Sequence, residues 1–274
     1  MSARPPALPN FADPPVTEVA LSAQFGALEA LQVPHVGLFW GRIRDRFPNV
    51  QQQPPQPALI ESFGKRQTGD SGIHIEFGDP RGVPRIWFFT TDETELIQLQ
   101  RDRFTQNWRK RAQGPAYPRY EALRRSFLQR AAELERFIAD ERLGDLKPMQ
   151  CELTYVNEIE VGHEAMDEAF TFWRDPPWAD PRSRAENVAV AVRRLLVGDD
   201  GAPLGRLHID MKPARRLSDQ QEVAILTLTA RGAPQGAGFD GVVGFFDLAR
   251  ESIVRAFASL TTAPMHKRWR RLDD

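Results

Sequence analysis

The sequence predicts an α+β fold of two similar halves, each an antiparallel sheet packed against a long helix. Short runs rich in β-branched and aromatic residues follow one another and are joined by short turns, which is typical of antiparallel strands. Each series of runs ends in one long amphipathic segment, Tyr120–Arg142 or Phe245–Leu260. No crossover helix separates successive strands, which argues against a parallel doubly wound sheet.

The first half is expected to cover residues 16–147, after a proline-rich arm of residues 1–15. Its first strand is predicted at Val16–Phe25 from the β-branched and aromatic content. A helix should follow, because apolar residues recur at helical spacing until Pro48 ends it. The segment Gln51–Pro57, rich in glutamine and proline, is expected to be an extended connector. The apolar positions of that helix are Val36, Phe39, Ile43 and Phe47.

Further strands are predicted at Ala58–Phe63, Ile73–Phe77 and Arg85–Asp92, followed after a short turn by the extended segment Glu95–Lys110. The segment Tyr120–Arg142 is the strongest predicted helix, because its apolar residues form one stripe with arginines and glutamates opposite. The stripe consists of Tyr120, Leu123, Phe127, Leu128, Ala131, Leu134, Phe137 and Ile138.

The second half is expected to cover residues 148–274 and to begin with a strand at Met149–Val161. Two alternating runs flank the sequence GDDG at Gly198–Gly201, which predicts a hairpin. A strand at Glu222–Gly232 and the helix Phe245–Leu260 follow. Because both halves place a strand first and a long helix last, the order of elements suggests an internal structural duplication.

Composition limits the function classes. Of 274 residues, 41% are hydrophobic and 27% charged, which is typical of a folded globular chain, and the formal net charge of −1 indicates no partner. The single cysteine, Cys151, excludes an intramolecular disulfide and favours a cytoplasmic location. The N-terminus lacks the apolar core of a signal peptide. No apolar run of about 18 residues is present, so no membrane partner is expected.

The segment Glu95–Lys110 combines a strand-like beginning with an unusual number of polar side chains. Strict alternation would make each face change from apolar to polar midway, so a β-bulge near Arg101 is expected to redirect the later side chains. Gln98 and Gln100 need hydrogen-bond partners if they are buried. Their row is therefore either an internal network joining the halves or the wall of a site for a polar ligand.

Residues 101–130 form the most basic segment, with nine arginines and lysines opposed only by Asp102 and Glu121. Aromatic residues are interleaved, and this composition suits nucleic acid, since arginines contact phosphates and rings stack on bases. The alternative is a solvated helix face, or arginines paired with glutamates of a neighbouring strand. The candidate binding residues are Gln98, Gln100, Arg101, Arg103, Asn107, Trp108, Arg109, Lys110, Arg111 and Arg119.

The best metal candidate is the sequence NEIEVGHE, in which Glu158 and Glu160 share a strand face and His163 follows. No second ligand pair accompanies them, so no metal site and no cofactor are predicted. His208 alternates with Leu207 and Ile209 in a predicted strand, which indicates that its ring faces away from them.

Seven stretches together resemble a sporadically distributed family of uncharacterised bacterial proteins of about this length: PPVTEV, RIWFF, LIQLQRDRFTQNWR, YPRYE, CELTYVN, LTARG and MHKRW. The resemblance covers nearly the whole chain and is most specific between Leu96 and Tyr120. It implies a bacterial cytoplasmic protein and brings no reaction, cofactor or catalytic residue. A sporadic distribution is associated with defence and toxin–antitoxin systems.

The leading hypothesis is a non-enzymatic binding or regulatory protein of such a system. It would engage a partner protein or nucleic acid through its arginine-rich surface. The alternative is an enzyme or small-ligand sensor with a polar pocket between the halves, lined by Gln98, Gln100, Arg101, Arg103 and Glu158. A homo-oligomer subunit, with Trp173, Trp178 and the arm in the contact, is a third hypothesis.

Overall fold

The chain has an α+β fold built on one large antiparallel sheet. The computed structural model describes residues 7–64, 83–162, 165–173 and 188–272. In these ranges nine strands form a single sheet in the order β2-β3-β4-β5-β1-β6-β9-β8-β7, and five helices accompany it. Every pair of neighbouring strands is antiparallel, as the sequence predicted.

Two long strands, β1 and β6, pair in the middle of the sheet, with Leu21 opposite Leu153. One group of strands lies beside β1, and the other lies beside β6. The strands are β1 (Val16–Phe25), β2 (Asn49–Gln53), β3 (Arg85–Phe89), β4 (Glu95–Gln100), β5 (Arg103–Arg109), β6 (Pro148–Glu160), β7 (Val190–Val197), β8 (Pro203–Arg215) and β9 (Glu222–Gly232).

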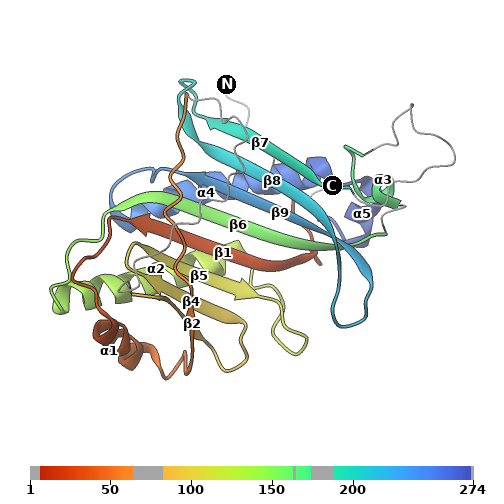
Figure 1. Cartoon of the computed structure of the whole chain (residues 1–274). Helices are drawn as coiled ribbons and strands as arrows, with labels where there is room; N and C mark the ends of the chain where they lie inside the picture. The colour runs from red at the N-terminus through yellow and green to blue at the C-terminus, as the bar shows by residue number, and fades with distance from the viewer. Residues whose placement is uncertain (1–6, 65–82, 163–164, 174–187, 273–274) are drawn as a thin grey trace.

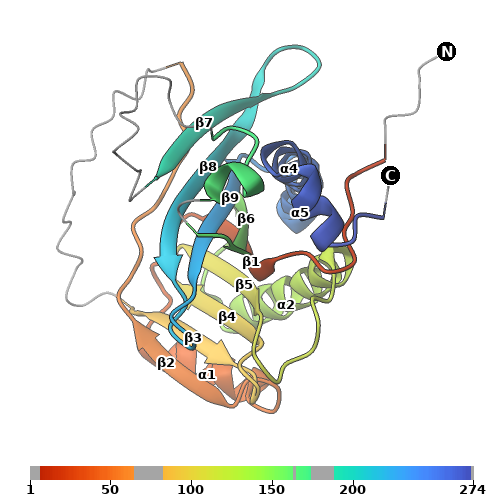
Figure 2. The ribbon, with the colours of Figure 1, turned by 90° about the vertical axis from the view of Figure 1, so that its right-hand side faces the viewer.

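The long helices α2 and α4 cover the same face of the sheet, and the core lies between them and the strands (Figures 1 and 2). The stripe predicted for the first long helix is buried in α2, apart from the partly exposed Leu128. None of the helices in the described ranges is long and apolar enough to cross a membrane. The helices are α1 (Val33–Ile43), α2 (Tyr120–Asp140), α3 (Met166–Ala169), α4 (Gly238–Leu260) and α5 (Ala263–Arg268).

The segment Glu95–Lys110 is a hairpin, so the β-bulge predicted near Arg101 is wrong. β4 ends at Gln100, residues 101 and 102 make the turn, and β5 returns beside it with Gln100 opposite Arg103. The change of character along the sequence therefore reflects a change of strand. In both strands most polar side chains lie on one face and most apolar ones on the other, with Glu95 and Gln106 as the polar exceptions on the apolar face.

The strand predicted at Ala58–Phe63 is also wrong. These residues form no strand, and the edge strand β2 instead uses Asn49–Gln53, whose last three residues were expected to begin the extended connector Gln51–Pro57. The predicted strand Ile73–Phe77 lies outside the described residues. The hairpin predicted around GDDG is confirmed, since Gly198–Gly201 joins β7 to β8.

Part of the N-terminal arm lies along the C-terminal end of the chain. The Phe11 side chain is buried, and its ring contacts Phe257 and Trp269 edge-on at centroid distances of 5.5 and 6.1 Å. The backbone N–H of Ala12 donates to the carbonyl of Arg270 at 2.9 Å. The two ends of the described chain therefore form one packed unit beside α4.

Replacing Gly232 with Ala is expected to lower the free energy of unfolding by about 1–3 kcal/mol, as overpacking does. Gly232 pairs with Gly205 across β8 and β9, and an added Cβ would overlap the Leu204 carbonyl oxygen and lie 2.5 Å from Phe245 Cε2. Denaturant unfolding measures the change. Gly37→Ala is the control, because its added Cβ would have no neighbour within 4 Å; equal effects would refute the close approach.

Candidate functional site: the polar face of the sheet and the junction cavity

The sheet face opposite α2 and α4, called the polar face below, carries polar side chains from six adjacent strands. Cross-strand pairing places Gln100, Arg103, Gln24 and Gln150 in one row. The three glutamines are buried, at 4–6% exposure. A parallel row on the second half contains Glu152, Arg231 and Arg206. Because buried amides need hydrogen-bond partners, the row of three glutamines requires another segment of the chain to lie over it.

The partner is a segment without secondary structure, Pro54–Gly64, called the strap below. Figure 1 shows it in orange, crossing the sheet roughly perpendicular to the strands, and Figure 2 shows it on the side away from the helices. Its backbone N–H groups at Gln56, Leu59 and Glu61 donate to Oε1 of three glutamines at 2.8, 3.1 and 2.8 Å. The accepting residues are Gln100, Gln24 and Gln150, respectively.

Contacts to the strap backbone continue beyond these three bonds. Gln100 Nε2 donates to the Gln56 carbonyl at 2.8 Å, so one glutamine satisfies both backbone groups of one strap residue. Arg103 donates to the Pro57 carbonyl at 2.9 Å and to Gln24 Oε1 at 2.6 Å. Because these bonds use main-chain groups, they hold an extended chain without depending on most of its side chains.

Glu61 is the charged anchor of the strap. Its carboxylate accepts hydrogen bonds from Arg206, from His208 Nε2 at 2.6 Å and from Arg231 at 3.3 Å. The Glu61 side chain is only 3% exposed and the three partners 11–16%. Arg231 also bonds Glu152 at 2.6 Å. A carboxylate on the strap thus meets two arginines and a histidine on β8 and β9.

The surroundings of Glu61 keep its carboxyl group ionised. Burial alone would raise its pKa, but the hydrogen bond and charge of His208 and the charges of Arg206 and Arg231 outweigh burial. The pKa therefore lies below its usual value. The strap is consequently anchored by a charged group at neutral pH.

A second polar network lies on the first-half side of the polar face. Gln98 Oε1 accepts from Trp87 Nε1 at 2.8 Å, and its Nε2 donates to Asn107 Oδ1 at 2.7 Å. Asn107 in turn donates to Glu18 at 2.5 Å. The Arg109 guanidinium lies 5.0 Å from the centroid of the Trp87 ring. This network links β1, β3, β4 and β5 through side chains.

Five of the ten candidate binding residues therefore share the polar face: Gln98, Gln100, Arg103, Asn107 and Arg109. Arg101 does not join them, because it lies in the β4–β5 turn and pairs with Glu29 at 2.7 Å. Trp108 is on the opposite sheet face, where it packs on Tyr117. The polar pocket expected from Gln98, Gln100, Arg101, Arg103 and Glu158 is thus not brought together as one site.

The nine basic residues of segment 101–130 are also dispersed, and several are paired with acidic side chains. Arg109 pairs with Glu18, and Arg111 with Glu93. Further along, Arg124 pairs with Asp247 and Arg130 with Glu133. Arg119 instead donates to the carbonyls of Phe11 and Ala12, at 2.7 and 2.9 Å.

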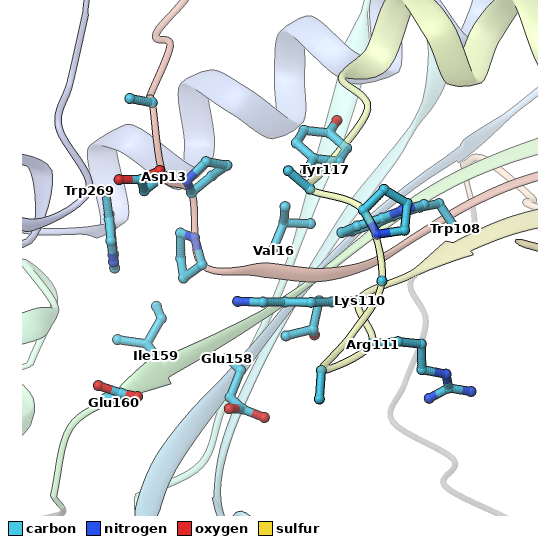
Figure 3. Close-up of a pocket in the computed structure, with 18 of the residues that line it drawn as sticks. Asp13, Val16, Trp108, Lys110, Arg111, Tyr117, Glu158, Ile159, Glu160 and Trp269 are labelled. Atoms are coloured by element: carbon cyan, nitrogen blue, oxygen red, sulfur yellow. The ribbon is translucent and has the colours of Figure 1, made fainter. Parts of the chain in front are cut away.

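Lys110, Arg111 and Arg119 line a cavity of about 440 Å³ between the arm, the β5–α2 loop, β6 and the C-terminal residues, called the junction cavity below. Figure 3 shows the Lys110 side chain lying between Val16 and Glu158, while Arg111 points away. The lining contains five cationic and three anionic side chains. They are Lys110, Arg111, Arg119, Arg216 and Arg268, with Asp13, Glu158 and Glu160.

The metal candidates Glu158 and Glu160 are ion-pair partners of Arg216, at 2.8 and 2.7 Å. Arg268 also pairs with Glu160. His163 lies outside the described residues. In the described ranges no three His, Cys, Asp or Glu side chains gather as a metal site would require.

Much of this arrangement was not predicted from the sequence, above all the contributions of Gln24, Gln150, Glu61, Arg206 and Arg231. Each contributes to the strap site through a contact between residues at least 35 positions apart. The one usable signal was the orientation predicted for His208, which does face away from Leu207 and Ile209. Comparison of the sequence with protein-family models and with curated proteins found no significant match.

Proposed function

We propose that this is a non-enzymatic binding or regulatory protein that engages an extended, acidic segment of a partner protein on its polar face. In the free protein the strap lies across that face. The observation that carries the proposal is the row of three glutamines bonded to the strap backbone. A sheet that holds an extended chain through main-chain groups accepts other sequences in the same place, as other peptide-binding sheets do through their edges.

The strap has the properties of an occupant that another segment can replace. Leu59 and Ile60 are 44% and 57% exposed, so its apolar side chains add little burial. Its principal side-chain anchor is the Glu61 carboxylate. A partner segment with an acid at this position would make the same contacts. It must compete with a tethered strap whose effective concentration is of millimolar order, so additional contacts elsewhere are needed.

An extended peptide fits the polar face better than nucleic acid does. The three glutamine oxygens accept hydrogen bonds from N–H groups, and a sugar–phosphate backbone has no N–H to donate. The dispersal of the basic residues also removes the continuous cationic surface that phosphate contacts require. Binding of nucleic acid is therefore an alternative result that the experiment below detects.

We also infer that the chain arose by internal duplication and acts in the bacterial cytoplasm, in a defence or toxin–antitoxin type system. Supporting the duplication, β1 with the meander β3–β5 and α2 has the same order as β6 with β7–β9 and α4. The lone Cys151, which is free and buried, suits a reducing compartment. The sporadic distribution of the family that the sequence resembles supports a role in a defence or toxin–antitoxin system.

The proposal is tested with a fluorescein-labelled peptide of the strap sequence, PPQPALIESFG, titrated with the full chain carrying Glu61→Ala. This variant loses the carboxylate that holds its own strap, so the peptide should bind it more tightly than it binds the wild type. A peptide with Gln in place of the glutamate should bind about tenfold or more weaker, because it loses charge-assisted hydrogen bonds of about 1.5–3 kcal/mol each. Arg194→Ala, at an exposed position of β7, is the matched control.

Equal binding of the two peptides, or no binding by the folded Glu61→Ala protein, would refute the proposal. Hydrogen exchange at the Leu59 amide reports whether the strap has left the polar face. Persistent protection of that amide in Glu61→Ala without peptide binding would also contradict it, since Glu61 would then not be the anchor. Salt-sensitive binding of single-stranded DNA in place of peptide would favour the nucleic-acid hypothesis.

A further inference from the structure

A smaller chamber of about 260 Å³ adjoins the junction cavity and shares Pro14, Val16, Tyr117 and Arg119 with it. It lies between the arm, the start of α2, α4 and the middle of the sheet. Its lining is mixed, because aromatic and aliphatic side chains lie beside asparagines, tyrosine hydroxyls and three charged side chains. The residues on which the argument depends are Phe11, Tyr117, Tyr120, Tyr155, Arg250 and Phe257.

All three tyrosines of the chain line this chamber. The hydroxyl oxygens of Tyr117 and Tyr155 lie 3.2 Å apart, and Tyr120 donates to Asp247 at 2.7 Å. Burial raises the pKa of Tyr117 and Tyr155, so both hydroxyls are protonated at neutral pH. Because the pair has two hydrogens and its mutual bond uses one, the other can donate to a ligand.

Of the two arginines that line the chamber, Arg119 donates to the carbonyls of Phe11 and Ala12, which leaves the charge of Arg250. Within the described ranges its guanidinium makes no hydrogen bond and no ion pair, and its contact is with the Tyr120 ring, 5.0 Å from the centroid. Glu121 also lines the chamber but forms no ion pair with it. A guanidinium beside an apolar wall favours an anion that can accept from its fixed pair of donors.

Apolar side chains of the arm and of α4 form another part of the lining. Phe11, Ile253 and Phe257 are 1–7% exposed, and the two phenylalanine rings meet edge-on at 5.5 Å. Leu228 from β9 closes the floor. A flat apolar body fits beside these side chains, since aromatic pairs prefer offset and edge-on contacts. The chamber is slightly smaller than sites for drug-sized ligands, which start at about 300 Å³, so it suits a single ring.

We propose that this chamber binds a small aromatic monocarboxylate. Its carboxylate accepts hydrogen bonds from Arg250 and from the free hydroxyl hydrogen of the Tyr117–Tyr155 pair. Its ring packs against Phe11, Ile253 and Phe257. Because Phe11 belongs to the arm, an occupied chamber holds the arm against α4 and adds to its docking.

Calorimetric titration of the full chain with benzoate tests the site, with benzyl alcohol as the uncharged probe of the same shape. Benzoate is expected to bind the wild type at least tenfold more tightly than benzyl alcohol. Arg250→Gln should weaken benzoate at least tenfold and leave benzyl alcohol unchanged. Tyr117→Phe should weaken benzoate several-fold while keeping the ring, and it provides a second variant if Arg250→Gln fails to fold.

Arg125→Gln on the exposed side of α2 is the matched control, because it removes one arginine that does not line the chamber. It should leave both affinities unchanged. Absence of benzoate binding by the folded wild type at millimolar concentration would overturn the proposal. Equal benzoate affinities for wild type, Arg250→Gln and Tyr117→Phe would do so as well.

Discussion

Replacing Phe127 with Ala is expected to lower the free energy of unfolding by about 3–5 kcal/mol, the usual cost of truncating a buried phenylalanine. Phe127 lies in the middle of α2 and is fully buried. Its ring centroid is 5.8 Å from Phe104 on β5 and 5.1 Å from Phe246 on α4. The cavity would therefore open where the sheet and both long helices meet, and these elements cannot collapse into it easily.

Urea unfolding followed by circular dichroism measures this change, with Arg125→Ala as the control. Arg125 is exposed two residues earlier on the same helix, so its replacement should change stability by about 0.5 kcal/mol at most. Phe127→Leu should cost less than Phe127→Ala, because it leaves a smaller cavity. A loss under about 1 kcal/mol for Phe127→Ala would show that this packing is wrong.

Replacing Glu61 with Ala is expected to lower the free energy of unfolding by about 3 kcal/mol, near the lower end of the range for breaking a buried ion pair. The substitution leaves Arg206 and Arg231 close together without their shared carboxylate. His208 loses its partner at 2.6 Å as well. Glu29→Ala is the control, because Glu29 also pairs with an arginine but its side chain is 78% exposed.

The same interaction predicts a dependence on pH. The pKa of Glu61 is lower in the folded chain than its usual value of 4.5, so the unfolded state binds the proton more tightly. The contribution of Glu61 is therefore complete above pH 4.5 and is lost as the pH falls through the folded pKa. The stability difference between wild type and Glu61→Gln, from urea unfolding at successive pH values, should shrink on acidification. A difference that stays constant would contradict this account.

The elements read most directly from the sequence are those with long regular patterns. The stripe from Tyr120 to Ile138 predicted α2 because helical spacing is a local property. Strands were likewise predicted where β1, β6 and β9 lie, and for β1 the signal was its β-branched and aromatic content. The β4–β5 turn was missed because Arg101 and Asp102 lack the glycine or asparagine signal of tight hairpins. The pairing of β4 with β5, and not the chemistry of the two turn residues, fixes the reversal of the chain at Arg101 and Asp102.

The strap illustrates the limit of pattern reading. Ala58, Leu59 and Ile60 predicted a strand, because short apolar runs with β-branched residues are typical of strands. In the fold this segment has no strand beside it, and glutamine side chains satisfy its backbone N–H groups at Leu59 and Glu61. Local periodicity cannot distinguish a chain bonded to a strand from one bonded to side chains.

The sequence by itself determined the buried stripe of α2 and that the strands are antiparallel, since helical spacing and short turns are local properties. Only the tertiary structure decided that Gln24, Gln100 and Gln150 form one row beneath the strap and that Glu61 meets Arg206, 145 residues away. The physical reason is that strand order and register decide which side chains come into contact. Both depend on packing the whole sheet against α2 and α4, which no single segment specifies.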